Sequence, residues 1–248
     1  MDKLLYVAMS GAKETLRAQA ANTHNLANAS TTGFKADLSA FQSRAVTGPG
    51  YASRVYATDQ TVGWDHATGA VQQTGNPLDL AIHGQGFFAV QDANGKEAYT
   101  RAGDLHVDPT GQLLTATGLP VLGDNGPISV PPSTSITVGG DGTISIVPLG
   151  QPPQTAAHVG RIKLVNPPLD TVKRSADGLF RTTDGTPAVA DASTTVSSGS
   201  LESSNVDLAT CMVNMIELAR RFDLQVKALR TAEEDGAASA KLLQSSGP

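Results

Sequence analysis

The chain has 248 residues, a formal net charge of -5 at pH 7 and a sequence pI near 5.5. This balance offers no basic surface, so we expect neither nucleic acid nor anionic lipid as a partner. The single cysteine, Cys211, excludes an internal disulfide and a multi-cysteine metal site. With 40% hydrophobic residues, 25 Gly and 14 Pro, the composition indicates a folded protein with many turns and short strands.

The N-terminal segment has the apolar spacing of an amphipathic helix, which we expect over residues 2–29. Gly33 is the candidate for a left-handed residue just beyond this helix. Three asparagines, Asn22, Asn25 and Asn28, recur every third residue, and we expect them to hydrogen-bond to a neighbouring backbone or helix. The spacing of four and three residues is carried by Leu5, Met9, Ala12, Leu16, Gln19, Thr23 and Leu26.

The same segment superficially resembles a cleaved signal peptide, with Lys3 before an apolar run and a small-x-small motif at residues 18–20. However, Lys13, Glu14 and Arg17 interrupt the stretch before that motif, and the helical period continues through it. No segment approaches the roughly 20 apolar residues that a membrane span requires. We therefore expect no cleaved signal peptide and no membrane insertion.

The middle of the chain changes character twice. Residues 35–74 show no sustained period and are expected to form an extended connector. From Leu78 the apolar residues alternate, and turn signals such as Asn94-Gly95 and Asp141-Gly142 then separate short Val, Ile, Leu and Phe runs. Residues 75–200 are therefore expected to form an antiparallel β domain.

The last fifth of the chain carries a second helical seam, and such a narrow stripe is stable only against another helix. The N-terminal helix is the candidate partner within the chain. The expected fold is thus mixed and mainly β, with residues 1–34 and 201–248 supplying terminal helices that pair as a coiled-coil-like inner domain. The positions of this seam are Leu208, Met212, Met215, Ala219, Phe222, Val226 and Leu229.

The motifs that could support catalysis or ligand binding are incomplete. Gly84-Gln85-Gly86 matches a dinucleotide-binding pattern, but a second strand follows it where a helix N-terminus would be needed, so we expect a strand-turn-strand. Asp104, His106 and Asp108 form the best metal-like cluster, but the polar face of a hairpin explains them better. With no complete set of nucleophile, base and orienting group, we expect no enzyme activity, no cofactor and no metal.

Three blocks of sequence resemble the bacterial flagellar rod and hook proteins. Residues His24 to Lys35 contain the Asn-Leu-Ala-Asn-x-x-Thr-x-Gly-Phe signature, Leu78 to Phe88 is similar to the opening strand of the family's β domain, and Gly199 to Asp207 to its C-terminal entry. Within the family, the start of the chain and Arg220 to Lys227 are most similar to proximal rod subunits, with the distal rod and hook subunits as alternatives.

The resemblance implies a non-enzymatic subunit of the periplasm-spanning rod, exported uncleaved by the flagellar export apparatus. It would polymerise helically with copies of itself and with other proximal and distal rod subunits, and transmit torque. A secreted β-rich adhesin remains a remote alternative from composition alone. The residues expected at inter-helix and assembly contacts are Leu5, Met9, Leu16, Asn25, Leu26, Asn28, Gly33, Phe34, Leu208, Met212, Met215, Phe222, Val226 and Leu229.

Overall fold

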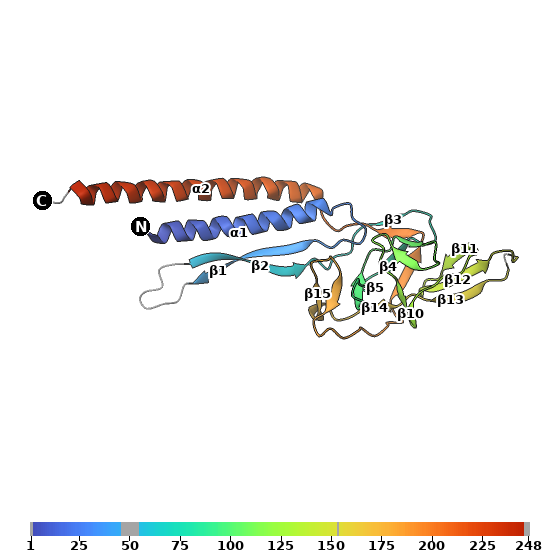
Figure 1. The fold of residues 1–248 in the computed structure, drawn as a ribbon. Helices are drawn as coiled ribbons and strands as arrows, with labels where there is room; N and C mark the ends of the chain where they lie inside the picture. The colour runs from blue at the N-terminus through green and yellow to red at the C-terminus, as the bar shows by residue number, and fades with distance from the viewer. Residues whose placement is uncertain (1, 46–54, 153, 246–248) are drawn as a thin grey trace. The chain divides into compact units, whose positions relative to one another are not determined.

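The computed structural model describes residues 2–45, 55–152 and 154–245, and side chains over residues 5–42, 63–152 and 154–241. It contains two compact units (Figure 1). Unit 1 consists of Met1–Ala29, Ala36–Asp65 and Val206–Pro248, and unit 2 of Ser30–Lys35 and His66–Asn205. The mixed, mainly antiparallel β fold with a helix near each end, predicted from the sequence, is confirmed.

Unit 1 contains the two helices, α1 (Asp2–Ala27) and α2 (Leu208–Ser245). They pack together and run in opposite directions, and α1 also contacts the hairpin described below (Figure 1). At about 1.5 Å per residue, α2 is roughly 57 Å long and α1 roughly 39 Å. The predicted pairing of the terminal helices therefore occurs within a single chain.

The remainder of unit 1 is a long antiparallel hairpin of β1 (Asp37–Ala45) and β2 (Val55–Trp64). Its register runs from Asp37 opposite Trp64 to Ala45 opposite Val55, with a shift between Leu38 and Ser39. Here the structure differs from the predicted connector at residues 35–74. Apolar and polar residues do not alternate along these strands, so the local pattern gave no signal. The Gly48-Pro49-Gly50 sequence, which we expect to interrupt the segment, lies outside the described residues.

Unit 2 is built from short strands joined by tight turns. Its largest sheet has the strand order β14-β5-β6-β16-β15, a second has the order β11-β12-β13, and the named pairings are antiparallel, as predicted. The strands are β3 (Val71–Gln73), β4 (Leu80–His83), β5 (Phe87–Gln91), β6 (Glu97–Thr100), β7 (Leu105–Val107), β8 (Leu113–Thr115), β9 (Leu122–Gly123), β10 (Gly126–Pro127), β11 (Ser133–Val138), β12 (Thr143–Pro148), β13 (Ala157–Arg161), β14 (Leu164–Val165), β15 (Val172–Arg174), β16 (Phe180–Thr182), β17 (Thr195–Ser198) and β18 (Ser200–Glu202), with a 3-10 turn η1 (Leu169–Thr171) before β15.

The hydrophobic core of unit 2 gathers large side chains from strands far apart in the sequence. Phe88, Leu113 and Ile144 are fully buried, and the rings of Phe87 and Phe180 lie 5.0 Å apart. Burial of each such side chain contributes roughly 1.5 to 3 kcal/mol. Residues 84–86 turn between β4 and β5, so the predicted strand-turn-strand is confirmed.

Unit boundaries in the structure follow a different division from the predicted segments. The hairpin at residues 37–64 lies with the helices, whereas residues 30–35 and 66–74 lie with the β unit.

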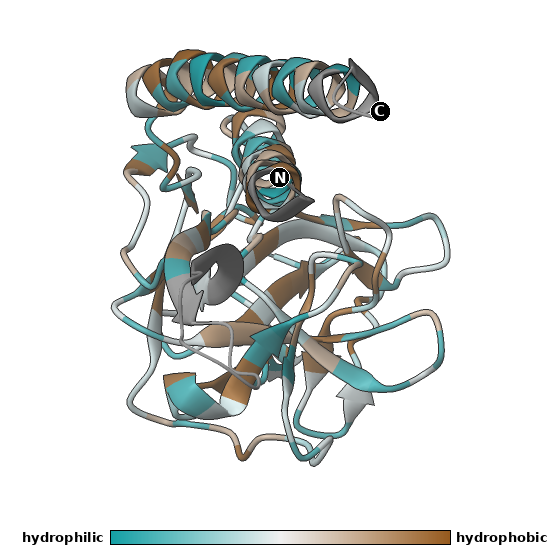
Figure 2. Ribbon diagram, turned by 90° about the vertical axis from the view of Figure 1, so that its left-hand side faces the viewer, coloured by the Kyte–Doolittle hydropathy of each residue, from teal (hydrophilic) through white to brown (hydrophobic). Residues whose placement is uncertain are grey.

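Hydrophobic segments recur along α2 as well as inside the β unit (Figure 2). Within the described residues, no helix combines the length and the hydropathy that a membrane span would need.

Candidate assembly surfaces and chain junction

The buried residues of α2 recur every seven positions. Cys211, Leu218 and Ala232 are each only 8% exposed, and Gln225, at the same repeat, is half-buried. This is the periodicity of a paired helix. The inner contact is therefore made by small and medium side chains around one polar residue.

The predicted seam of α2 is only partly on this inner side. Met215, Phe222, Val226 and Leu229 are half-buried, whereas Leu208 and Met212 are 50% and 55% exposed. On the surface of α2, residues 215, 222 and 229 lie between two columns of side chains, one at residues 211, 218, 225 and 232 and the other at residues 212, 219 and 226. The predicted seam used the second column, which is more apolar. The structure instead buries the column that begins at Cys211.

The inner face of α1 is similarly small and polar. Ala12, Thr15 and Ala18 are buried, Leu5 and Leu26 are half-buried, and the larger side chains Met9 and Leu16 are each 49% exposed. Within one chain, therefore, Met9, Leu16, Leu208 and Met212 do not pack between the helices. Contacts of these four residues with other subunits stay a prediction.

The asparagines near the end of α1 hydrogen-bond to backbone; Asn22 and Asn25 do so to neighbouring segments, as expected, and Asn28 to its own helix. Asn22 Nδ2 donates to the Cys211 carbonyl at 2.8 Å, and Asn28 Nδ2 donates to the His24 carbonyl of its own helix at 2.9 Å. Asn25 clasps the first residue of β1 from both sides, because its Nδ2 donates to the Asp37 carbonyl at 2.9 Å and its Oδ1 accepts the Asp37 N–H at 2.8 Å. Asn25 thus fixes the start of the hairpin against α1.

Gly33 and Phe34 lie in unit 2. Gly33 has a φ of +66°, as predicted, and its N–H donates to the Glu202 carbonyl at 2.8 Å. A Cβ at Gly33 would lie 2.3 Å from the carbonyl carbon of Arg101, so only glycine fits. Phe34 is 8% exposed, and the Arg174 guanidinium stacks over its ring at 4.3 Å from the centroid.

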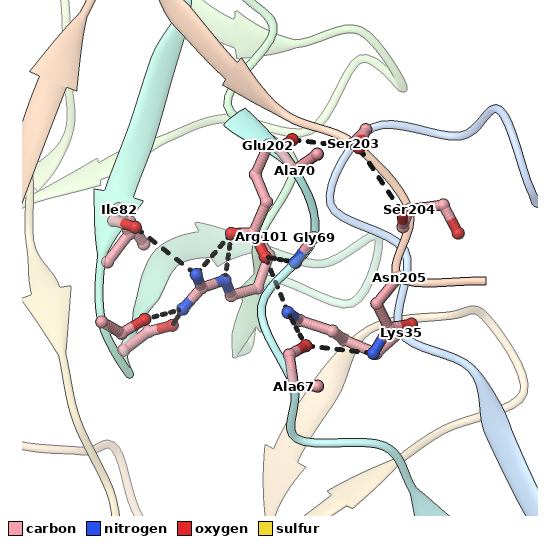
Figure 3. Close-up of polar contacts among 12 residues, drawn as sticks. Lys35, Ala67, Gly69, Ala70, Ile82, Arg101, Glu202, Ser203, Ser204 and Asn205 are labelled. Carbon is pink, nitrogen blue, oxygen red and sulfur yellow. Dashed lines mark hydrogen bonds and ion pairs between the residues drawn. The ribbon is translucent and has the colours of Figure 1, made fainter. Parts of the chain in front are cut away.

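A buried group of three charged residues, Lys35, Arg101 and Glu202, lies beside these positions in unit 2 (Figure 3). We call it the root cluster. Lys35 Nζ donates to Glu202 Oε1 at 2.7 Å, while Arg101 Nε donates to Oε2 at 2.8 Å and Arg101 Nη2 also bonds Oε2. These side chains are at most 3% exposed. Arg101 Nη1 is further bonded to the carbonyls of Gly84 and Gly86, each at 2.9 Å.

The root cluster joins three chain segments that lead from unit 2 into unit 1. Lys35 Nζ also donates to the Ala67 carbonyl at 2.7 Å, and the Gly69 N–H donates to Glu202 Oε1 at 2.9 Å. Asn205 Nδ2 donates to the same Ala67 carbonyl at 3.0 Å (Figure 3). The segments at residues 33–35, 66–69 and 202–205 are therefore held in one arrangement before the chain enters unit 1.

The charge balance of the root cluster determines how Glu202 titrates. Burial by itself would raise the pKa of Glu202, but the hydrogen bond from Lys35 and the positive charge of Arg101 outweigh it, so the pKa lies below the usual range. Glu202 is thus a carboxylate near neutral pH, and it satisfies two buried cations.

Gly33 and Phe34 were predicted as site residues in this region, but none of the three charged residues was. Lys35 and Glu202 stand inside two of the blocks that resemble the flagellar family, which was an available signal. The signal for Arg101 was weaker: it is an isolated charged residue between Tyr99 and Gly103, which are both buried. Long-range ion pairing across about 100 residues has no local pattern.

The cluster that resembled a metal site has other roles. Asp108 Oδ1 accepts the N–H groups of Thr110 and Gln112 at 2.9 and 2.8 Å and so caps a turn. Asp104 Oδ1 is buried without a hydrogen-bond partner, and burial raises the pKa of this carboxyl. Over the described side chains, no three His, Cys, Asp or Glu residues are grouped closely enough to hold one ion.

We predict that Gly33→Ala destabilises unit 2 more than Gly178→Ala. Both glycines have a positive φ, which costs an alanine about 1–2 kcal/mol, but open space surrounds Gly178 whereas a Cβ at Gly33 meets the Arg101 backbone. Urea unfolding of both variants measures the difference, expected to be at least about 2 kcal/mol. Equal losses would show that the close approach at Gly33 is relaxed in solution.

We predict that Glu202→Gln lowers the free energy of unfolding by about 3–5 kcal/mol at neutral pH, because it leaves Lys35 and Arg101 buried without a counter-charge. Because the folded pKa of Glu202 is depressed, its contribution is complete above the unfolded value of about 4.3 and disappears as the pH falls through the folded value.

The difference between wild type and Glu202→Gln should therefore shrink when urea titrations are repeated below about pH 4. Asp177→Asn is the matched control, since it removes a more exposed ion pair with Arg181 and should cost no more than about 1 kcal/mol. A pH-independent difference would contradict the ionic role of Glu202.

Comparison with known proteins matches all three blocks. Residues 5–35 match the family described as flagella basal body rod protein, residues 81–146 the flagellar hook protein FlgE/F/G D1 domain, and residues 197–244 the flagellar basal body rod FlgEFG protein C-terminal family. These regions contain Gly33 to Lys35, part of the β core and the buried face of α2.

Full-length relatives narrow the assignment. The chain is 45% identical to the flagellar basal-body rod protein FlgF of Salmonella typhimurium, over 99% of this chain and 100% of the relative, and 44% identical to that of Escherichia coli over the same shares. It is 33% identical to the basal-body rod protein FlgG of Bacillus subtilis, over 94% of this chain and 96% of the relative. Because identity is higher to the FlgF proteins and extends from end to end, the chain belongs to the FlgF family of flagellar basal-body rod proteins, which are structural and not enzymatic.

Proposed function

We propose that this rod subunit occupies the proximal section of the rod and polymerises helically through the outward faces of α1 and α2. Its neighbours would be copies of itself and other rod subunits, and the assembled rod would transmit torque across the periplasm. A contact between unlike surfaces of successive subunits that does not close into a ring produces a helical polymer, as a rod requires.

The exposed apolar side chains of the helices carry this proposal. On α2, Met212, Val213 and Ile216 are 55%, 56% and 63% exposed, and Leu224 is 64% exposed. A folded protein rarely leaves such a row of large apolar residues in water unless a partner covers it. Their helical spacing suits another amphipathic helix, and the terminal helices of neighbouring subunits provide one.

On α1, Tyr6, Met9 and Leu16 form the corresponding outward set, at 47%, 49% and 49% exposure. The two outward sets lie on different helices, so one subunit can offer one surface to each of two neighbours. This is the unlike pairing that helical growth requires.

The root cluster supports the torque-transmitting role. The chain passes between the units next to the segments at residues 33–35, 66–69 and 202–205, which the buried charges hold together, so a load carried along the chain passes through them. Hydrogen bonds between ionised groups in a low-dielectric site are the stronger class and resist rearrangement.

We further propose that the flagellar export apparatus secretes the subunit without cleaving α1. Cleavage after Ala20 would remove Ala12 and Thr15, which are buried within unit 1, and would leave α2 without most of its partner. In purified basal bodies, mass spectrometry should detect the peptide that contains Leu5 and Met9. A mature N-terminus near Asn22 would contradict uncleaved export.

The assembly surface is tested with Met212→Ser/Ile216→Ser. Because both side chains are largely exposed in the subunit, we expect a stability change within about 0.5 kcal/mol but loss of the variant from basal bodies and of swimming. Each replacement removes roughly 1–2 kcal/mol of apolar burial at every subunit contact. Immunoblots of isolated basal bodies and motility plates measure the two effects.

Leu149→Ser/Val189→Ser is the matched control, since these residues of unit 2 are 72% and 86% exposed. The control should assemble and swim normally. Normal incorporation of the helix variant would disprove the assembly surface, and equal defects in both variants would place the contact outside the helices.

A further inference from the structure

Two hydrogen bonds between the described side chains and backbone link α1 to α2. Thr15 Oγ1 lies 3.0 Å from Gln225 Oε1, and Asn22 Nδ2 donates to the Cys211 carbonyl at 2.8 Å. Thr15 and Asn22 are 2% and 8% exposed, so water does not readily replace these partners. The helix pair thus has polar contacts at two separate levels.

Gly11 makes room for one of them. A Cβ at Gly11 would lie 2.9 Å from Gln225 Nε2, and the Thr15 hydroxyl also lies 2.9 Å from the Gly11 carbonyl. A glycine in a helix interior costs about 1 kcal/mol relative to alanine. Here it allows the Gln225 amide to lie against the α1 backbone.

The seven-residue repeat of α2 makes a sliding error chemically plausible. A shift by one heptad would place Leu218 or Ala232, in place of Gln225, beside Gly11, and apolar packing alone would tolerate either. The shift that places Leu218 beside Gly11 would also move Asn22 beyond the start of α2 and leave its buried amide without a partner, whereas the opposite shift would offer it the Leu218 carbonyl. Polar residues inside a helix pair are known to select one register in this way, at some cost in stability.

We infer that Gln225 and Asn22, with Gly11 beside them, fix the register of α2 on α1. They are positioning residues. By fixing the register, they also determine which apolar side chains face outward, and this consequence alone rests on the proposed function.

The single native cysteine gives a direct test in the purified full chain. A second cysteine is placed, one variant at a time, at Ala18, Gln19 or Leu26, which lie about one turn from Asn22, or at Ala12, one heptad before Gln19. After mild oxidation of dilute protein, Cys211 should form an intrachain disulfide with at least one of the first three positions and not with Ala12, because bridged Cα atoms lie within about 7 Å.

The same scan is repeated with Asn22→Leu/Gln225→Leu. Loss of two hydrogen bonds, together worth about 2 kcal/mol, should raise the fraction of chains with the Ala12 disulfide about thirtyfold relative to wild type. Leucine favours helix formation at both positions, so circular dichroism should show unchanged helix content. If the double variant loses helix, Gln225→Leu alone is compared with wild type. Thr231→Leu, an exposed position on α2, is the matched control and should keep the wild-type pattern.

The inference is overturned if the leucine variant keeps the wild-type disulfide pattern, or if the wild-type chain already forms the Ala12 disulfide. Neither result depends on rod assembly, since the readout is intrachain. Failure of the register and failure of the assembly surface are therefore distinguishable, because the second is read from basal bodies and swimming.

Discussion

The buried carboxylate of Glu202 holds together the chain segments that lead from unit 2 towards the helices. Charged residues make up only 17% of the chain, yet three of them are buried together here. Taking ions out of water is costly, and the cost is offset only when nearly every donor and acceptor is matched. Lys35, Arg101 and the Gly69 N–H provide that match. A hydrophobic cluster could give equal stability, but it would not position three chain segments by directional bonds.

The remaining junction contacts follow from this arrangement. Lys35 can reach Glu202 only if the chain turns sharply just before it, and the positive φ of Gly33 makes that turn. Phe34, between them, is then held under Arg174, whose Nη1 donates to the Lys35 carbonyl at 2.8 Å. One short stretch of sequence therefore combines a backbone requirement, an aromatic contact and a buried charge.

The fold was predictable from sequence where its signals are local. Alternation from Leu78 and the turn at Asp141-Gly142 identify strands and hairpins because both depend on neighbouring residues. Gly33 was predictable for the same reason. The β1–β2 hairpin was not, because apolar and polar residues do not alternate along its strands, and Arg101 was not, because its partner lies 101 residues away. The buried column of α2 that begins at Cys211 was not predicted, because Met215 and Phe222 lie between it and the more apolar column that begins at Met212.

The buried column of α2 shows how unit 1 divides its side chains. Maximising apolar burial within one chain would place Met212 and Leu16 between the helices, yet the structure places Cys211, Gln225 and Thr15 there. A polar, close-packed inner contact gives less hydrophobic stabilisation but specifies its alignment. The large apolar side chains are thereby left on outward faces, where their burial becomes available only on association. In a rod subunit, weak but specific pairing within the chain and strong apolar pairing between chains would make assembly the step at which most of the helices' hydrophobic free energy is released.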